Sequence, residues 1–392
     1  MPDFSTGAGV KIRILHFASG DAWGGAERVI ETLVSATLEA CEIRAVLLND
    51  GRLAEVLRGQ GVPVTVILES GRSFGALCRE VRKAVARSSC DVIHCHRYKE
   101  LLLAVVTAPF HRLPIVVTIH GLEPRNQLRL RQFVQIWGAL LLARWLGVGF
   151  AAVSRELADR LARWPLAVRA VEIPNPMPSV GTGEGMPDLR TRFGWDSGRP
   201  LVGFIGRLET VKGPDLFLEI AQRGSARFGW VVVGSGSMEK ELAARCQAEG
   251  LGERVRFLGS VPEAAPLLRQ LDALAMTSRH EGTPMALLEA AACEVPVIAF
   301  GVGGIPALLE YAPRTWCVPP GDVDAFARAL DGLLESPESS RRAAQEWAAS
   351  IRPRYAQDAV RDAYLALYAR GLGAKGTPVG DPASSRGQGE PM

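Results

Sequence analysis

Two cations, Arg207 and Lys212, stand just after an apolar run and just before a helical pattern. A guanidinium presents a rigid fork to phosphate oxygens and an ammonium acts as a point charge, so this pair could hold a diphosphate without a metal ion. A departing diphosphate gains negative charge in the transition state, and cations aimed at it lower the barrier. Taken alone, such a pair more often marks a solvated basic loop. The segment reads Gly206-Arg207-Leu208-Glu209-Thr210-Val211-Lys212-Gly213.

Two carboxylates, Glu281 and Glu289, flank the predicted start of a helix. We expect Thr283 to be its N-cap and Pro284 its first residue. A helix N-terminus attracts phosphate through its free amides and its dipole. Carboxylates beside a bound phosphate repel it unless they face hydroxyl groups. We therefore expect Glu281 to accept hydrogen bonds from sugar hydroxyls and Glu289 from ribose hydroxyls. The alternative is that the two glutamates are simply exposed to solvent. The free amides would be those of Met285, Ala286 and Leu287.

Glycines lie in several of the predicted loops that join strands to helices. Gly24 and Gly25 open a helical pattern, Gly234 and Gly236 follow an apolar run, and Gly282 lies in the loop before the helix just described. A residue without Cβ lets a ligand approach the backbone closely, although each position also fits a simple turn. The Gly234 segment lacks the third glycine and the downstream acid of a dinucleotide-binding fingerprint, which argues against an oxidoreductase.

Histidine stands at the ends of two predicted strands. His120 follows the apolar run 115–119, a place where a polar side chain faces the ligand cleft of a parallel sheet; the alternative is a core histidine bonded to backbone. His94 and His96 alternate as metal ligands can, but no third ligand is apparent near them. We expect one of the two to point into the core and the other toward the cleft.

The elements that would position these residues are short apolar strands alternating with helical patterns. The strands are apolar throughout, as expected for strands buried on both faces of a parallel sheet. The pattern predicts an α/β fold of doubly wound sheets, which bind ligands at the carboxyl ends of their strands. The expected strands are 11–17, 43–48, 64–68, 91–95, 115–119 and 150–153, then 201–205, 230–233, 255–258, 273–276, 295–299 and 316–318.

The two strand series are separated by a segment rich in proline and glycine that begins at Ile173. A length of 392 residues also favours two domains. If the two sheets face each other, both sets of strand ends line one cleft, which suits an enzyme that joins two substrates. We expect a first Rossmann-like domain over 1–178, a linker over 179–199, a second Rossmann-like domain over 200–352, a helix over 353–370 that packs back on the first domain, and a disordered tail over 371–392.

Composition argues against several classes of protein. The net charge of +3, without a basic run or basic–aromatic interleaving, predicts no nucleic-acid partner. The seven cysteines are scattered and form no C-x-x-C, which favours a reducing compartment over a disulfide framework or a zinc site. The N-terminal residues do not resemble a secretory signal, and no long uncharged apolar stretch occurs, so we expect a cytoplasmic protein.

The segment 128–150 is apolar with interspersed arginines. An apolar face that carries tryptophan and is bordered by arginine suits a membrane surface. A buried helix of the first domain is the favoured interpretation. Peripheral contact with the inner face of a membrane is the alternative.

The motifs and their order along the chain resemble those of the retaining glycosyltransferases of family 4, which have the two-domain GT-B fold. The segment 278–290 matches the family's E-x7-E motif, and 206–213 matches its G-R…K-G pattern. The runs V-V-G-x-G, R-F-L-G, P-V-I-A and G-G-x-P follow in the same order, and the likeness is strongest from 201 to 322. Pro176 and Ala307 depart from the family, at positions where glycine and glutamate are frequent.

The resemblance implies a role for each motif of the second domain. Arg207 and Lys212 would hold the diphosphate of a nucleotide-sugar donor. Glu281 would contact the transferred sugar and Glu289 the ribose, with the segment Phe257–Val261 along the nucleobase.

The resemblance also implies that the first domain binds the acceptor. Its Gly24-Gly25 loop would close over the donor diphosphate, and His120 would contact the donor sugar.

The implied activity is the transfer of a sugar from an NDP-sugar, with UDP favoured over GDP, to a hydroxyl group with retained configuration. The acceptor would be a saccharide, a lipid-linked saccharide or a small molecule, in polysaccharide, glycolipid or glycoconjugate synthesis. No cofactor or metal is expected. Asp322-Val323-Asp324 looks like the metal-binding D-x-D of other glycosyltransferases, but its place before an amphipathic helix predicts that Asp322 is an N-cap.

Two rival functions fit the same architecture. A nucleotide-sugar 2-epimerase would release an altered sugar without an acceptor, and it does not carry this pair of motifs. A catalytically silent sugar-nucleotide-binding subunit is disfavoured by the intact Glu281, His120 and Lys212.

Overall fold

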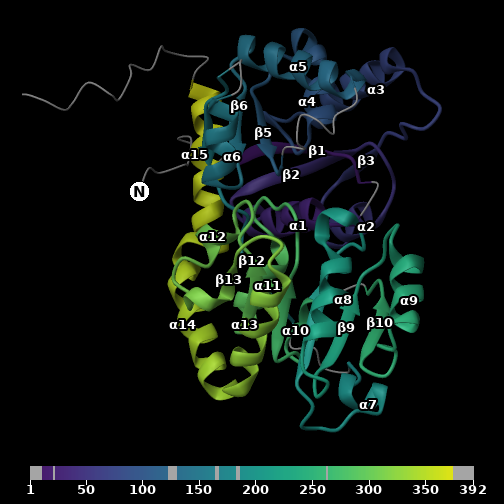
Figure 1. The fold of residues 1–392 in the computed structure, drawn as a ribbon. Coiled ribbons are helices and arrows are strands. Elements are labelled where there is room, and N and C mark those ends of the chain that lie inside the picture. Colours follow the sequence, from purple (N-terminus) through teal and green to yellow (C-terminus); the bar gives the residue numbers. More distant parts are fainter. Residues whose placement is uncertain are drawn as a thin grey trace, which may run out of the picture.

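The structure, a computed structural model, describes residues 11–20, 23–121, 130–163, 167–181, 186–261 and 264–373. These residues form two α/β domains, one above the other in Figure 1, and each domain is built on a parallel sheet. The predicted fold of two doubly wound Rossmann-like domains is therefore confirmed. Within the described residues, no helix combines the length and the apolarity that crossing a bilayer requires.

The first domain has a seven-stranded sheet in the order β3-β2-β1-β4-β5-β6-β7. The order reverses between β1 and β4, which is the switch point where doubly wound sheets bind ligands. The strands are β1 (Ile12–Ala18), β2 (Cys41–Leu47), β3 (Val64–Val66), β4 (Val92–Cys95), β5 (Ile115–Ile119), β6 (Gly149–Ala152) and β7 (Ala170–Glu172). The helices are α1 (Gly25–Thr37), α2 (Arg52–Gly59), α3 (Phe74–Ser88), α4 (Tyr98–His111), α5 (Leu130–Trp145) and α6 (Arg155–Ala162).

The second domain has a six-stranded sheet in the order β10-β9-β8-β11-β12-β13, with its switch point between β8 and β11. The strands are β8 (Leu201–Ile205), β9 (Gly229–Val233), β10 (Val255–Gly259), β11 (Ala273–Met276), β12 (Val297–Phe300) and β13 (Cys317–Val318). The helices are α7 (Leu189–Phe193), the 3-10 turn η2 (Thr210–Lys212), α8 (Pro214–Arg223), α9 (Glu239–Ala248), α10 (Ala265–Leu268), α11 (Met285–Ala292), α12 (Ile305–Leu308), the 3-10 turn η3 (Arg314–Trp316) and α13 (Val323–Glu335).

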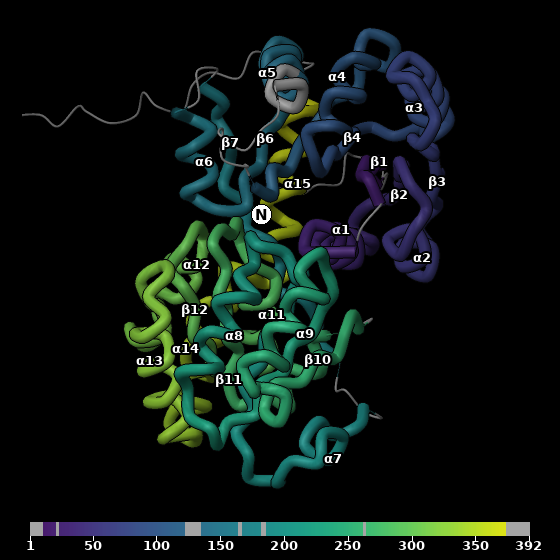
Figure 2. Tube along the Cα trace, turned by 45° about the vertical axis from the view of Figure 1, so that its right-hand side comes forward, coloured from purple at the N-terminus to yellow at the C-terminus, as the bar shows by residue number. Residues whose placement is uncertain are grey.

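The last two helices belong to different domains. Helix α14 (Pro337–Tyr355) packs in the second domain, whereas α15 (Gln357–Gly373) runs alongside the first domain, as the yellow helix in Figures 1 and 2 shows. The sequence predicts one helical stretch with an interruption near Pro353. In the structure Pro353 lies inside α14, and the interruption between the two helices is at Ala356, where the backbone is extended (φ −58°, ψ 143°).

Two details of the organisation differ from the sequence prediction. Residues 186–199, assigned to the linker, pack on the second domain, because Leu189 is buried in its core and Arg190 binds Asp272 at 2.6 Å. Strand β7 was not predicted. It has only three residues, and Val171 at its centre is exposed, so no apolar run marks it.

Candidate active site

A pocket lies between the two domains, lined by Trp23, Gly24 and Gly25 after β1 and by residues at the ends of β8, β9 and β11. Residues from both domains line it, so it is complete only when the domains are together. The predicted site residues that line it are Gly24, Gly25, Gly206, Arg207, Lys212, Gly234, Val261, Glu281, Pro284, Met285, Ala286 and Glu289. Those that do not line it are His120, Gly236, Gly282, Thr283 and Leu287.

Lys212 and Glu281 form an ion pair in this pocket. The Nζ of Lys212 lies 2.7 and 2.8 Å from the two carboxylate oxygens of Glu281. The hydroxyl of Ser278 donates to one of these oxygens at 2.6 Å. The Glu281 side chain is 6% exposed and that of Lys212 is 26% exposed. The carboxylate is thus satisfied by protein groups, while the ammonium keeps a face toward the pocket.

The turn that carries Lys212 is fixed by contacts that sequence patterns do not show. The turn ends at Gly213, whose φ of 65° favours glycine, and a Cβ there would lie 2.0 Å from the carbonyl oxygen of Thr277. Arg279 donates to the carbonyl of Thr210 at 2.8 Å. Nothing in its neighbourhood in the sequence distinguishes Arg279 from an ordinary surface arginine.

Arg207 is exposed, and its side chain makes no hydrogen bond or ion pair within the part of the chain that the structure describes. Its guanidinium therefore remains available to an anion. The backbone beside it is closely packed. A Cβ at Gly234 would lie 1.9 Å from the carbonyl oxygen of Gly206, and one at Gly236 would lie 2.4 Å from that of Leu208. Both glycines are required by loop packing, which favours the turn interpretation for Gly236.

The start of helix α11 differs from the prediction. Pro284 is the N-cap and Met285 the first helical residue, so Thr283 lies outside the helix. The Thr283 hydroxyl instead donates to the carbonyl of Val153 in the first domain. The amide of Leu287 is bonded to the carbonyl of Pro284 at 3.2 Å, and its side chain is buried in the core. The amides of Met285 and Ala286 remain at the free end of the helix.

Glu289 is paired with a residue of the other domain. The Nε of Arg28, on α1, lies 2.9 Å from Glu289 Oε1, an ion pair by distance although not an aligned hydrogen bond. The carboxylate is 4% exposed. Burial raises the pKa of Glu289, and the charge of Arg28 partly offsets this effect. Sequence reasoning missed Arg28, which is simply one of several charged residues on α1.

His120 lies beside the pocket rather than in its wall. A Cβ at Gly282 would lie 2.5 Å from the carbonyl oxygen of His120, so these two loops touch across the domain boundary. Burial lowers the pKa of His120 to about 4, with a smaller contribution from the charge of Arg97. The ring is therefore neutral at physiological pH, and its Nε2 has no partner among the described residues.

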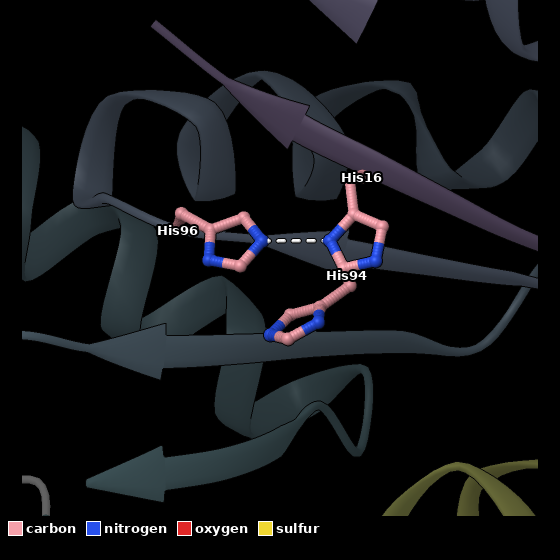
Figure 3. A group of neighbouring side chains, drawn as sticks. All are labelled: His16, His94 and His96. Atoms are coloured by element: carbon pink, nitrogen blue, oxygen red, sulfur yellow. Dashed lines mark hydrogen bonds between the residues drawn. The ribbon is translucent and has the colours of Figure 1, made fainter. Parts of the chain in front are cut away.

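His94 and His96 do not diverge as predicted. Both lie on the same face of the sheet, together with His16 of β1, because residues two apart along a strand point the same way (Figure 3). All three side chains are at most 1% exposed. His16 was missed because only the pairing of β1 with β4 brings it opposite His94.

The three histidines have nitrogens within 4.8 Å of one another, as a metal site would require. Four of their six nitrogens are nevertheless engaged by protein groups, and only His16 Nε2 and His96 Nδ1 have no partner among the described residues. Nε2 of His94 lies 2.8 Å from Thr118 Oγ1 and its Nδ1 lies 2.8 Å from the hydroxyl of Tyr368. His16 Nδ1 lies 2.9 Å from His96 Nε2. The group is better described as a hydrogen-bonded network that ties α15 to the first sheet.

The Asp322–Asp324 pair has structural partners. The Asp322 carboxylate accepts the amide of Ala325 at 2.8 Å, which confirms its prediction as the N-cap of α13. Asp324 binds Arg223 at 2.5 Å.

Comparison with known proteins places this pocket in a family. A model described as Glycosyl transferases group 1 matches residues 186–348, and a model described as Glycosyltransferase Family 4 matches residues 23–178. The chain belongs to glycosyltransferase family 4. The two models cover both walls of the pocket, and the family assignment makes the protein a glycosyltransferase.

Named relatives agree with this assignment, and a solved structure has the same fold. The chain is 28% identical to a 2-deoxystreptamine N-acetyl-D-glucosaminyltransferase of Streptomyces fradiae, over 70% of this chain and 69% of that protein. It is 33% identical to a D-inositol 3-phosphate glycosyltransferase of Mycobacterium marinum, over 50% of this chain and 45% of that protein. The fold resembles Anabaena HepE in complex with UDP-glucose, with a TM-score of 0.80, 22% identity, and coverage of 93% of this chain and 100% of that one.

Proposed function

We propose that this glycosyltransferase moves a sugar from a UDP-sugar to a hydroxyl group, with retained configuration and without a metal ion. The observation that carries the proposal is the Lys212–Glu281 pair, set beside the unpaired Arg207 and the free end of α11 in one pocket. Both carboxylates of the pocket, Glu281 and Glu289, already have cationic partners. Arg207, whose side chain has no ion pair within the described residues, and the exposed face of the Lys212 ammonium would supply the positive charge that a diphosphate needs.

The reaction follows from this placement. Arg207, Lys212 and the amides of Met285 and Ala286 hold the diphosphate as the bond between the anomeric carbon and the phosphate oxygen breaks. The acceptor hydroxyl attacks the anomeric carbon from the same face. Its proton passes to the departing phosphate oxygen, so no separate protein base is required.

Glu289 and Val261 are proposed to bind the nucleoside. The ribose hydroxyls would donate to Glu289 and share it with Arg28, which lies at 2.9 Å. Val261 lines the same pocket as Glu289 and would give an apolar contact for the base. UDP is favoured because the structurally similar HepE carries UDP-glucose.

We further propose a small ring polyol as the acceptor, ahead of a polysaccharide. The relatives named above act on 2-deoxystreptamine and on D-inositol 3-phosphate, which are both hydroxylated six-membered carbocycles. A small acceptor also agrees with a pocket whose first-domain wall comes from the loop after β1 and from α1.

The two rival functions predict different outcomes when the protein meets a UDP-sugar. An epimerase would convert a UDP-sugar to a free sugar without an acceptor, and a silent subunit would bind it unchanged. Incubation of the protein with UDP-, GDP- and ADP-sugars and a panel of cyclitol and saccharide acceptors separates these cases. We expect transfer from a UDP-sugar in the presence of EDTA, and an NMR coupling constant of the product that shows a retained anomer. An inverted product, or activity abolished by EDTA and restored by a divalent metal, would contradict the proposal.

We also propose that the end of α5 touches a membrane surface. Leu141, Leu142, Trp145 and Leu146 are all exposed, and Trp145 is 88% exposed. Such a patch on one helix end is unusual for a surface that faces only water. Arg144 adds a cation beside it, which suits anionic lipid headgroups.

A further inference from the structure

Arg28 connects the two domains through Glu289. It belongs to α1 of the first domain, which packs against α11 of the second domain (Figure 2). Its Nε lies 2.9 Å from Glu289 Oε1, and Arg28 has no other ion pair within the part of the chain that the structure describes. The side chains of Arg28 and Glu289 are 19% and 4% exposed. The pair is therefore shielded from water, where opposite charges attract more strongly than at the surface.

The other carboxylate of the pocket is held differently. Glu281 bonds to Lys212 and to Ser278, which both belong to the second domain. The Glu281 arrangement is thus complete within one domain, whereas the cation beside Glu289 comes from the opposite domain. Of these two carboxylates, Glu289 alone depends on contact between the domains for its counter-charge.

The contact between Arg28 and Glu289 is electrostatic rather than a directed hydrogen bond. Arg28 Nε has no hydrogen-bond partner among the described residues, although the carboxylate lies beside it. The Glu289 carboxylate likewise accepts no hydrogen bond from the described residues. Arg28 thus supplies charge and leaves the carboxylate oxygens free to accept from a ligand. Hydroxyl groups are suitable donors to such an anion.

We propose that Arg28 is a positioning residue of the first domain, which keeps Glu289 charged and oriented to accept the ribose hydroxyls of the donor nucleotide. The nucleoside end of the donor site is then shared by both domains, whereas the cations proposed for the diphosphate, Arg207 and Lys212, belong to the second domain. This inference rests on the proposed transfer from a UDP-sugar and assigns a further residue to that site.

The charges around Glu289 support this role. Burial raises the pKa of Glu289, Arg28 lowers it, and Glu31 of α1 raises it. Among the charged groups on α1, α10 and α14, which pack against α11, Arg28 and Glu31 are the two that act on this carboxylate, and α11 carries no other charge. Without Arg28, burial and Glu31 act unopposed, so Glu289 takes up a proton at a higher pH. A protonated carboxyl is a weaker acceptor for a hydroxyl group.

A double-mutant cycle on the Kd of UDP, measured by calorimetry at about pH 7, tests the proposal. Arg28→Gln removes the charge, and we expect it to raise the Kd about five- to tenfold, as when a hydrogen bond to a charged acceptor becomes one to a neutral acceptor. In a Glu289→Gln background the same substitution should change the Kd less than about twofold, because Arg28 acts through Glu289. Arg28→Lys keeps the cation and has no directed hydrogen bond to reproduce, so its Kd should lie within about threefold of wild type.

Two further measurements separate positioning from general support of the fold. On acidification, Arg28→Gln should lose UDP affinity at a higher pH than the wild type, and Glu289→Gln and the double variant should not differ in this respect. The donor KM of Arg28→Gln should rise with its Kd, while kcat falls less than about threefold, because the cations of the second domain are untouched. Arg58→Gln, on α2 and 46% exposed, is the matched control and should behave as wild type.

Three results would overturn the inference. These are a wild-type Kd in Arg28→Gln, an equal loss of affinity with and without the Glu289 carboxylate, and an Arg28→Lys variant that binds UDP as weakly as Arg28→Gln. Absence of UDP binding by the wild-type protein would instead refute the proposed function.

Discussion

Lys212 and Glu281 act as one charge-neutral unit, because the ammonium contacts both carboxylate oxygens at 2.7 and 2.8 Å. Lys212→Ala removes a cation from the proposed diphosphate site and leaves a buried carboxylate without its counter-ion. We expect kcat to fall by about 10²–10³-fold, the usual loss for one preorganised stabiliser of developing charge. Steady-state kinetics with the UDP-sugar check this, and Lys240→Ala on the exposed face of α9 should leave kcat unchanged. Wild-type turnover in Lys212→Ala would refute the diphosphate role.

The buried histidines predict acid-sensitive stability. Burial lowers the pKa of His16 and of His120 to about 4, and that of His94 and His96 well below the usual 6.5. The unfolded chain therefore binds more protons, so the free energy of unfolding falls as pH drops through 6.5, by about 1.4 kcal/mol per pH unit for each histidine. Glu289 acts in the opposite sense, because its pKa is raised.

Urea denaturation between pH 5 and 8 measures this dependence. We expect a plateau above about pH 7.5 and a steady decline from pH 6.5 to pH 5, before most carboxylates titrate. His16→Asn should reduce the slope of the free energy of unfolding against pH by up to about 1.4 kcal/mol per pH unit, which corresponds to one bound proton. A midpoint that does not change between pH 5 and 8 would show that the histidines are not buried and neutral.

At the scale of elements, the loop after β12 supports the loop before α11. Gly303 has a φ of 56°, and a Cβ there would lie 1.8 Å from the carbonyl oxygen of Glu281. Gly303→Ala must displace that backbone, so we expect at least a tenfold loss of kcat/KM together with a lower Tm. Gly250→Ala is the matched control, because Gly250 has a similar φ of 67° and open space around it. It should cost only about 1 kcal/mol of stability and no activity.

If both variants lose stability equally and keep activity, backbone strain alone explains the loss of stability, and the packing of Gly303 against Glu281 does not affect activity.

The start of α11 depends on more than its local sequence. The sequence places a helix start near Pro284, but whether Thr283 caps it depends on a competing acceptor. That acceptor, the carbonyl of Val153, belongs to the other domain.

At the scale of the whole molecule, the apolar end of α5 predicts lipid binding. We expect the protein to co-sediment with vesicles that contain anionic lipid. The double substitution of Trp145→Ser and Leu146→Ser should weaken this at least tenfold, because each buried apolar side chain contributes about 1.5–3 kcal/mol. Tyr311→Ser, on an exposed residue of the second domain, is the control. Equal sedimentation of all three proteins would contradict membrane contact through α5.

The sequence alone determined the class of fold and most of the residues with which the second domain lines the pocket. Strands buried on both faces must be apolar throughout, and an anion site at a strand end needs local glycine and cations. Both are short-range patterns, so Arg207, Lys212, Glu281 and Glu289 were found without coordinates.

Only the tertiary structure decided the partners of these residues. Arg28 reaches Glu289 from the other domain, Thr283 bonds across the domain boundary instead of capping its helix, and His16 lies opposite His94 through strand pairing. Each contact joins residues far apart in the chain. No local pattern encodes such contacts, because they depend on how the sheets and domains are placed relative to one another.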